Sequence, residues 1–223
     1  MADPAPAIFD IFPTLPSQIS ARIGRAIVEG EYKPGQKLRE VDLAQAFGVS
    51  RASVREALRL LESEGLVTIL PQRGAQVTSL TADEVRDVFD IRANLMGLAC
   101  RRLAAGATPD IVRQLEALLK ALGTSKDDGE AYARASLTIS EFCVRNAGSK
   151  RLGDLILSFG RQTARYTRLS LSSTTRRRQS LANWRELVDA LASGKQAAAE
   201  RVARQLVLDT RDAALKMLPT TGK

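Results

Sequence analysis

The sequence predicts a mainly α-helical protein in which a three-helix unit with a β-hairpin precedes a larger, all-helical bundle. Three observations support this prediction. Apolar residues recur at helical spacing in most segments, glycines and prolines separate these segments, and two short β-rich runs lie together before residue 79. With 223 residues, of which 44% are hydrophobic and 26% charged, the chain is long enough for two domains and too apolar for wholesale disorder.

The N-terminal unit is expected over residues 17–79. Residues 1–16 are rich in proline and predict a flexible arm. A first helix runs from Ser17 to Gly30, because its apolar residues recur at helical spacing: Ile19, Ile23, Ala26 and Ile27.

Two further helices and a hairpin complete this unit. Residues 40–47 fit a short second helix, and Ser50 is a good N-cap for a third helix that reaches about Glu64. The β-rich runs 66–70 and 75–78 then predict a hairpin, whose connector Pro71-Gln72-Arg73-Gly74 places a glycine where a positive φ is often needed.

From residue 80 to residue 218 the pattern is almost entirely helical. Thr81 and Glu84 form a capping box, and Thr108 followed by Pro109 is a second signal for a helix start. The run Arg176-Arg177-Arg178 is expected in an exposed loop. Six helices are predicted, over residues 81–105, 109–122, 130–146, 150–171, 178–193 and 196–217.

The composition excludes several classes of function. The absence of histidine removes the usual parts of most hydrolytic sites, so we expect no enzyme and no cofactor. Two cysteines, Cys100 and Cys143, are too few for a disulfide framework. No apolar run is long enough to cross a membrane, and the N-terminus lacks the basic start of a secretory signal. We therefore expect a cytoplasmic protein without membrane contact.

The net charge of +8 favours a nucleic-acid partner, but its distribution does not locate one. Residues 1–78 hold nine basic and nine acidic side chains, so the whole excess lies in residues 79–223. A prediction of DNA binding therefore depends on motif and on the placement of charge within the first unit.

The third predicted helix has an apolar face and a basic face, as DNA binding by a helix requires. One stripe is apolar and faces a core: Val54, Ala57, Leu58 and Leu61. The outward positions at its N-terminal end are Arg51, Ala52, Ser53 and Arg55. Arginine donates two hydrogen bonds to guanine in the major groove, and a helix N-terminus with serine hydroxyls favours phosphate. The alternative is an amphipathic surface helix with ordinary solvated arginines.

The N-terminal unit closely resembles the GntR family of bacterial transcription regulators. The resemblance lies in Pro34–Leu38, Arg39-Glu40, Phe47–Leu58, Leu61-Glu62, Glu64–Val67, Arg73-Gly74 and Val77. It implies a winged helix-turn-helix whose hairpin enters the minor groove. The implied DNA-contacting residues are Arg39, Ser50, Arg51, Ala52, Ser53, Arg55, Arg73 and Gly74. Ala52 occupies a position where Thr or Ser is common, so one hydroxyl contact is expected to be missing.

Residues 80–218 resemble the FCD effector domain, through Asp90-Ile91-Arg92, Asn146–Ser149 and Leu187–Leu191. The resemblance implies a helical domain that binds a small molecule and supplies dimer contacts. FCD domains commonly hold a divalent metal through one Asp and three His. The corresponding positions here are Ser136, Ser140, Trp184 and about Leu206. None is a usual ligand, so we expect no metal. The alternative is that these four side chains pack a core.

The resemblance also implies an organic acid as the effector, and arginine forks bind carboxylates. The expected contacts are Arg92, Ser136, Ser140, Arg161, Arg165 and Trp184. For the stripe of Arg161 and Arg165 the alternative is a solvated surface, and for Arg92 it is a structural ion pair.

These observations predict a homodimeric transcription regulator, expected to be a repressor, that binds a short inverted repeat of double-stranded DNA. An anionic organic effector would modulate that binding from the helical domain. Two alternatives remain open. One is a DNA-binding regulator whose sensor domain has lost its ligand response. The other is a helical-bundle interaction protein or enzyme.

Overall fold

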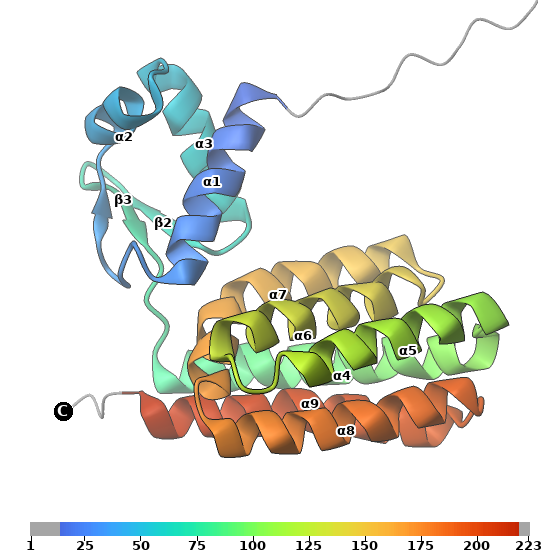
Figure 1. Cartoon of the computed structure of the whole chain (residues 1–223). Coiled ribbons are helices and arrows are strands. Elements are labelled where there is room, and N and C mark those ends of the chain that lie inside the picture. Colours follow the sequence, from blue (N-terminus) through green and yellow to red (C-terminus); the bar gives the residue numbers. More distant parts are fainter. Residues whose placement is uncertain (1–13, 219–223) are drawn as a thin grey trace, which may run out of the picture. The chain divides into compact units, whose positions relative to one another are not determined.

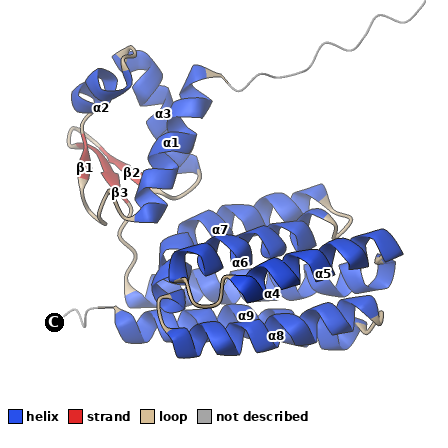
Figure 2. Ribbon diagram, viewed as in Figure 1, coloured by secondary structure: helices blue, strands red, loops and turns tan. Residues whose placement is uncertain are grey.

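The structure is a computed structural model, and it describes residues 14–218. The predicted arm of residues 1–16 lies outside this range except for its last three residues. The chain divides into two compact units, Met1–Ser79 and Leu80–Lys223. Figure 2 shows helices in both units and strands in the first alone. The predicted fold class, a winged helix-turn-helix followed by a helical bundle, is confirmed.

The first unit packs three helices against a small antiparallel sheet (Figure 1). Strand order in the sheet is β1-β3-β2, and β1 is a two-residue strand that the sequence pattern did not predict. The elements are α1 (Leu15–Glu29), β1 (Lys37–Leu38), α2 (Glu40–Phe47), α3 (Arg51–Ser63), β2 (Val67–Leu70) and β3 (Gly74–Val77).

Helix α1 begins two residues earlier than its apolar pattern indicates. The Thr14 side chain accepts a hydrogen bond from the amide of Ser17, and Pro16 fits the first turn because no amide hydrogen is needed there. The predicted apolar stripe of α3 is buried in the core of this unit: Val54, Ala57, Leu58 and Leu61.

The hairpin between β2 and β3 has the backbone that its sequence predicts. Gly74 has φ 79°, in the left-handed region that glycine adopts without strain. Gln72 also has a positive φ, of 61°, which is uncommon for a residue with a side chain. The tip is closed by a hydrogen bond of 3.1 Å from the amide of Arg73 to the carbonyl of Leu70.

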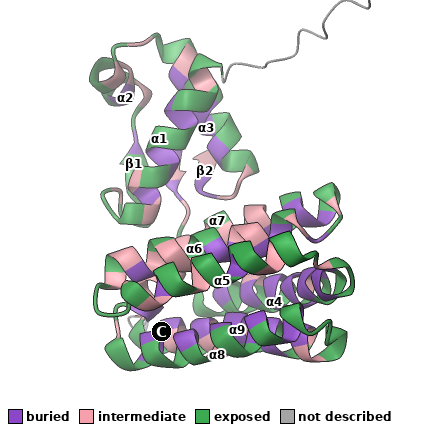
Figure 3. Cartoon of the chain, turned by 45° about the vertical axis from the view of Figure 1, so that its right-hand side comes forward, coloured by how far each residue is buried: buried purple, intermediate pink, exposed green. Residues whose placement is uncertain are grey.

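The second unit is a bundle of six helices over its described residues, with buried and exposed positions alternating along each helix (Figure 3). Helix α4 packs mainly on α9 and also on α7. Both cysteines are free thiols buried in this core. The helices are α4 (Ala82–Gly106), α5 (Pro109–Thr124), α6 (Gly129–Arg145), α7 (Lys150–Leu171), α8 (Thr174–Ala192) and α9 (Gln196–Met217).

The expected exposed loop at residues 176–178 is wrong. Helix α8 begins at Thr174, so the three arginines lie in its first turns, and Arg176 and Arg177 are only 6% and 5% exposed. Ser173 supplies the N-cap that the sequence interpretation overlooked. A run of three arginines suggested solvent, but guanidinium groups can be buried where backbone carbonyls accept their hydrogen bonds.

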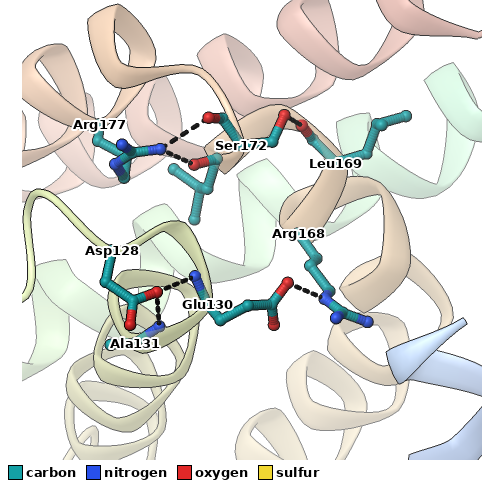
Figure 4. A network of polar contacts seen from close by, with 8 residues as sticks. Asp128, Glu130, Ala131, Arg168, Leu169, Ser172 and Arg177 are labelled. Atoms are coloured by element: carbon teal, nitrogen blue, oxygen red, sulfur yellow. Dashed lines mark hydrogen bonds and ion pairs between the residues drawn. The ribbon is translucent and has the colours of Figure 1, made fainter.

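Arg177 is such a group (Figure 4). Its Nη1 donates to the carbonyls of Leu171 and Ser172 at 2.9 and 2.7 Å. These two carbonyls lie at the end of α7, where no further helical turn supplies an amide donor. Its Nε donates to the carbonyl of Lys126 at 2.7 Å, in the loop before α6. Arg177 therefore ties the α7–α8 connection to the α5–α6 loop.

Replacing Arg177 with Met should lower the free energy of unfolding by about 3 kcal/mol, because several backbone carbonyls lose a charged donor. Urea unfolding followed by circular dichroism measures the change. Arg178→Met, one residue along on the exposed side of α8, is the matched control and should be close to neutral. Equal stabilities for the two variants would contradict this structural role.

Candidate nucleic-acid and effector sites

The N-terminal turn of α3 is organised by two serine hydroxyls. Ser50 Oγ accepts a hydrogen bond of 3.1 Å from the amide of Ser53, and the two hydroxyl oxygens lie 2.9 Å apart. This N-cap fixes where the helix starts and leaves the first amides of α3 at an exposed helix end. Such an end is a site at which an anion, such as a phosphate group, binds favourably.

The residues predicted to contact DNA come from three elements of the first unit. Arg39 is the exposed N-cap residue of α2, and Arg73 and Gly74 are exposed at the hairpin. On α3 itself Arg51, Ala52 and Arg55 are exposed and Ser53 is half-buried. The structure thus presents two arginines at the N-terminal half of α3, opposite the buried stripe of that helix.

Glu40 is a member of this surface that the sequence interpretation missed. Its carboxylate accepts hydrogen bonds of 2.9 and 2.8 Å from Nε and Nη2 of Arg55, and it lies 4.0 Å from Arg51. The hydrogen bond from Arg55 lowers the pKa of Glu40 below its ordinary value. The fork of Arg55 is therefore already occupied by a carboxylate, which fixes the orientation of the side chain and neutralises its charge.

The residues predicted to contact an effector fall into two groups. Arg92, Ser140 and Trp184 are buried on the inner faces of three different bundle helices, and Ser136 is half-buried one turn before Ser140. The alternative of a structural ion pair for Arg92 finds no support, since no ion pair or hydrogen bond of its side chain is present among the described residues.

Arg161 and Arg165 on α7 are placed differently. Arg161 is exposed, and the Arg165 guanidinium stacks on the ring of Tyr166, 4.6 Å from its centre. Desolvation lowers the pKa of Arg165, which is half-buried. The structure therefore does not group these two arginines with the buried polar side chains of the other helices.

The residues at the positions of the FCD metal site do not fit a divalent ion. Two hydroxyls, an indole and an aliphatic side chain offer no anionic or imidazole ligand. Within residues 14–218, moreover, no three Cys, Asp or Glu side chains converge as metal ligands would. In the same part of the chain, no helix is both long and apolar enough to cross a membrane.

The comparison with known families agrees with this geometry. The model of the bacterial regulatory proteins of the gntR family matches residues 15–77, and the model of the FCD domain matches residues 87–209. The chain belongs to the GntR family of transcription regulators and carries an FCD domain. The resemblance inferred from sequence motifs is thus confirmed, and the family consists of regulators rather than enzymes.

Individual relatives point to the same class. The chain is 34% identical over 143 residues to the uncharacterized HTH-type transcriptional regulator YdhC of Bacillus subtilis. This match covers 62% of this chain and 63% of YdhC. It is also 28% identical over 131 residues to the gluconate operon transcriptional repressor of Bacillus licheniformis. That match covers 58% of this chain and 54% of the repressor. The chain thus spans less than two thirds of the length of these relatives.

Among solved structures, E. coli McbR/YncC has a similar fold. The TM-score is 0.80, and the match covers 92% of this chain and 99% of that one at 18% identity. At this low identity the likeness shows the shared fold alone.

Glu40→Gln should change how this GntR protein discriminates between DNA sequences. Without the carboxylate, Arg55 becomes a mobile cation that can neutralise one more phosphate. We expect tighter binding to random DNA and a salt dependence steeper by about one unit of slope. Fluorescence anisotropy with specific and random duplexes, over a range of salt, measures both quantities. An unchanged slope would show that Glu40 does not restrain Arg55.

Proposed function

We propose that this GntR-family protein is a cytoplasmic, homodimeric repressor that binds a short inverted repeat of double-stranded DNA and responds to an anionic organic effector. The observation that carries the DNA-binding part is the N-terminal end of α3. There an exposed helix end, two exposed arginines and a capping serine pair stand opposite a fully buried apolar stripe. A helix of this design suits the major groove, and the hairpin suits a neighbouring groove.

The repressor role is supported by relatives. The Bacillus licheniformis protein and GlaR of E. coli, which is 39% identical over 69 residues, are both named as repressors.

Arg51→Ala tests base recognition. If Arg51 donates to a guanine, its loss should weaken specific binding by ~1–3 kcal/mol and leave binding to random DNA almost unchanged. Arg113→Ala removes the same side chain from an exposed site on α5 and is the matched control. Anisotropy titrations with an operator selected from genomic fragments provide the measurement. Equal weakening on specific and random DNA would make Arg51 a phosphate contact only.

The dimer is supported by an apolar seam on α4. Val88, Ile91, Leu95 and Leu98 follow one another at intervals of three, four and three residues, the spacing at which two helices pack along a shared seam. Ile91 is 47% and Leu98 38% exposed although both are large and apolar. A second copy of this helix related by a two-fold axis would cover them.

Leu98→Glu should therefore convert the dimer to a monomer, because it places a carboxylate next to its own symmetry mate in an apolar contact. Sedimentation velocity reports the change, and operator affinity should fall with it. The control is Leu137→Glu on α6, where the leucine is 45% exposed and outside the seam. A Leu98→Glu protein that remains dimeric would place the interface elsewhere.

The effector part of the proposal depends on Arg92. The residue Arg92 is only 9% exposed, the buried Nε of its guanidinium has no hydrogen-bond partner, and desolvation lowers its pKa to about 10. A buried cation without a counter-charge is strongly unfavourable and is retained where a ligand supplies the anion. Ser136, Ser140 and Trp184 are the proposed polar and apolar neighbours of that ligand. Arg161 and Arg165 would have to reorient to join them.

Arg92→Met should abolish release of DNA by an organic acid. It should also raise the stability of the ligand-free protein by ~1 kcal/mol or more, because a buried uncompensated charge is removed. Thermal unfolding and calorimetric titration measure the two effects, with Arg102→Met on the exposed side of α4 as control. A destabilised variant with normal effector binding would make Arg92 a structural residue. A wild-type protein that no acid releases from DNA would instead be a regulator without ligand response.

A further inference from the structure

The bundle contains buried hydrogen-bond donors that nothing in the described part of the chain accepts. The buried side-chain nitrogens without a partner are Nε of Arg92, Nε and Nη1 of Arg176, and Nε1 of Trp184. All four are donors only, and two of the three residues carry positive charge. The other buried side-chain atoms without a partner are the hydroxyls of Tyr132, Tyr166 and Ser170, which can donate as well as accept. Native proteins satisfy nearly all buried polar groups, so the unpartnered nitrogens of the two arginines point to a missing acceptor.

Arg176 is a cation that is only partly satisfied. Its Nη2 donates to the hydroxyl of Thr210 at 3.1 Å and weakly to the carbonyl of Leu206 at 3.4 Å, both on α9. No ion pair of Arg176 is present among residues 14–218. The carboxylate of Asp209 raises the pKa of Arg176 through space, without a hydrogen bond, and it accepts hydrogen bonds from the side-chain amides of Gln179, Asn183 and Gln205.

The position of Arg176 within α8 strengthens the need for an anion. Arg176 lies in the first turn of α8, where the exposed ends of the backbone dipoles are already positive. That turn contains no acidic residue, and Arg177 and Arg178 follow directly. Burial also lowers the pKa of Arg176, because desolvation disfavours its charged form.

The helices that carry Arg92 and Arg176 meet the same segment of α9, Arg92 from α4 and Arg176 from α8. Arg211 forms an ion pair with Asp90, and the stem of Arg204 lies against Gly97, so residues 204–211 of α9 run alongside residues 90–97 of α4. Arg92 falls within that stretch of α4. Arg176 meets the same segment of α9 from α8, through Leu206 and Thr210.

Three uncharged residues lie beside the two guanidinium groups, and Asp209 acts on Arg176 through space without an ion pair. Gly160 on α7 faces Arg92, and a Cβ at that glycine would lie 4.0 Å from Arg92 Nε. Tyr132 on α6 and Ser180 on α8 lie near Arg176. Neither guanidinium has a carboxylate within ion-pairing distance among the described residues, so a ligand would supply both negative charges.

We propose that the effector is a small organic dicarboxylate whose two carboxylates contact Arg92 and Arg176. This inference rests on the proposed function, since it specifies the ligand of the same effector site. Two guanidinium groups on different helices suit two separated carboxylates better than the single centre of a phosphate. Arg176, which the sequence placed in a loop, becomes the residue that selects dianions over monoanions.

The test is calorimetry on the full-length protein with matched acids. Succinate and glutarate are compared with succinamate, in which one carboxylate is an amide, with butyrate and with inorganic phosphate. The variants are Arg92→Met and Arg176→Met, which keep apolar volume, with Arg178→Met as the exposed control. Arg176→Lys, which keeps the charge, serves if Arg176→Met does not fold.

The expected result is at least a tenfold preference of the wild-type protein for one dicarboxylate over its monoamide, the scale of one charge-assisted contact. Arg176→Met should remove this preference and leave monoacid binding within about twofold, whereas Arg92→Met should weaken both. The Arg178→Met protein should behave as wild type.

Three results would overturn the inference. Equal binding of diacids and monoamide, unaffected by Arg176→Met, removes the role of Arg176 and leaves the proposed acid effector intact. Phosphate binding as tight as that of the diacids, lost in both variants, replaces the dicarboxylate by a single-centre dianion. Failure of every acid to bind the wild-type protein overturns the effector proposal as a whole, while DNA binding by Arg51 stands or falls separately.

Discussion

Desolvation of guanidinium groups is the constraint that organises the helical unit. Burial of an arginine is tolerable only where acceptors replace water, and three arginines meet this condition to different degrees. Arg177 is satisfied by backbone carbonyls and joins α7, α8 and the α5–α6 loop. Arg176 is satisfied at one nitrogen, and Arg92 has an unpartnered Nε. The first is thus explained by the fold itself, whereas the other two lack acceptors that the proposed anion would supply.

In the N-terminal unit, by contrast, the arginines are exposed to solvent and available to a partner. Arg51 and Arg55 remain in solvent, where their charge carries little penalty and is available to a polyanion. Glu40 then distinguishes them, because it occupies the fork of Arg55 and lies farther from Arg51. A surface that bound DNA by charge alone would gain nothing from this carboxylate. Its presence is understandable if geometry, and not only attraction, determines which DNA is bound.

Local sequence signals predicted most of the fold because they act locally. Caps such as Ser50, Thr81 and Thr108 fix helix starts through the backbone of the next few residues, and all three function as expected. The failures concern interactions between distant residues. Glu40 meets Arg55 across 15 positions, and the burial of Arg177 depends on a carbonyl 51 positions away. Sequence periodicity does not reveal such pairs, and for this reason the burial of Arg176 and Arg177 was not predicted.

Helix α4 is the element on which the proposed activities of the helical unit meet. Arg92 faces the interior of the bundle, while its neighbour Ile91 begins the most exposed part of the apolar seam. A ligand that binds Arg92 therefore acts on a helix whose other face would form the dimer contact. A helix moves as a nearly rigid rod. If neutralisation of Arg92 shifts α4, the apolar seam would therefore move with it as far as Leu98. In a two-fold dimer such a shift would alter the spacing of the two DNA-binding units. The affinity of the dimer for an inverted repeat of fixed half-site spacing would then change. On this scheme the instability of the empty site is functional, since the free energy regained on binding the anion is what biases the dimer.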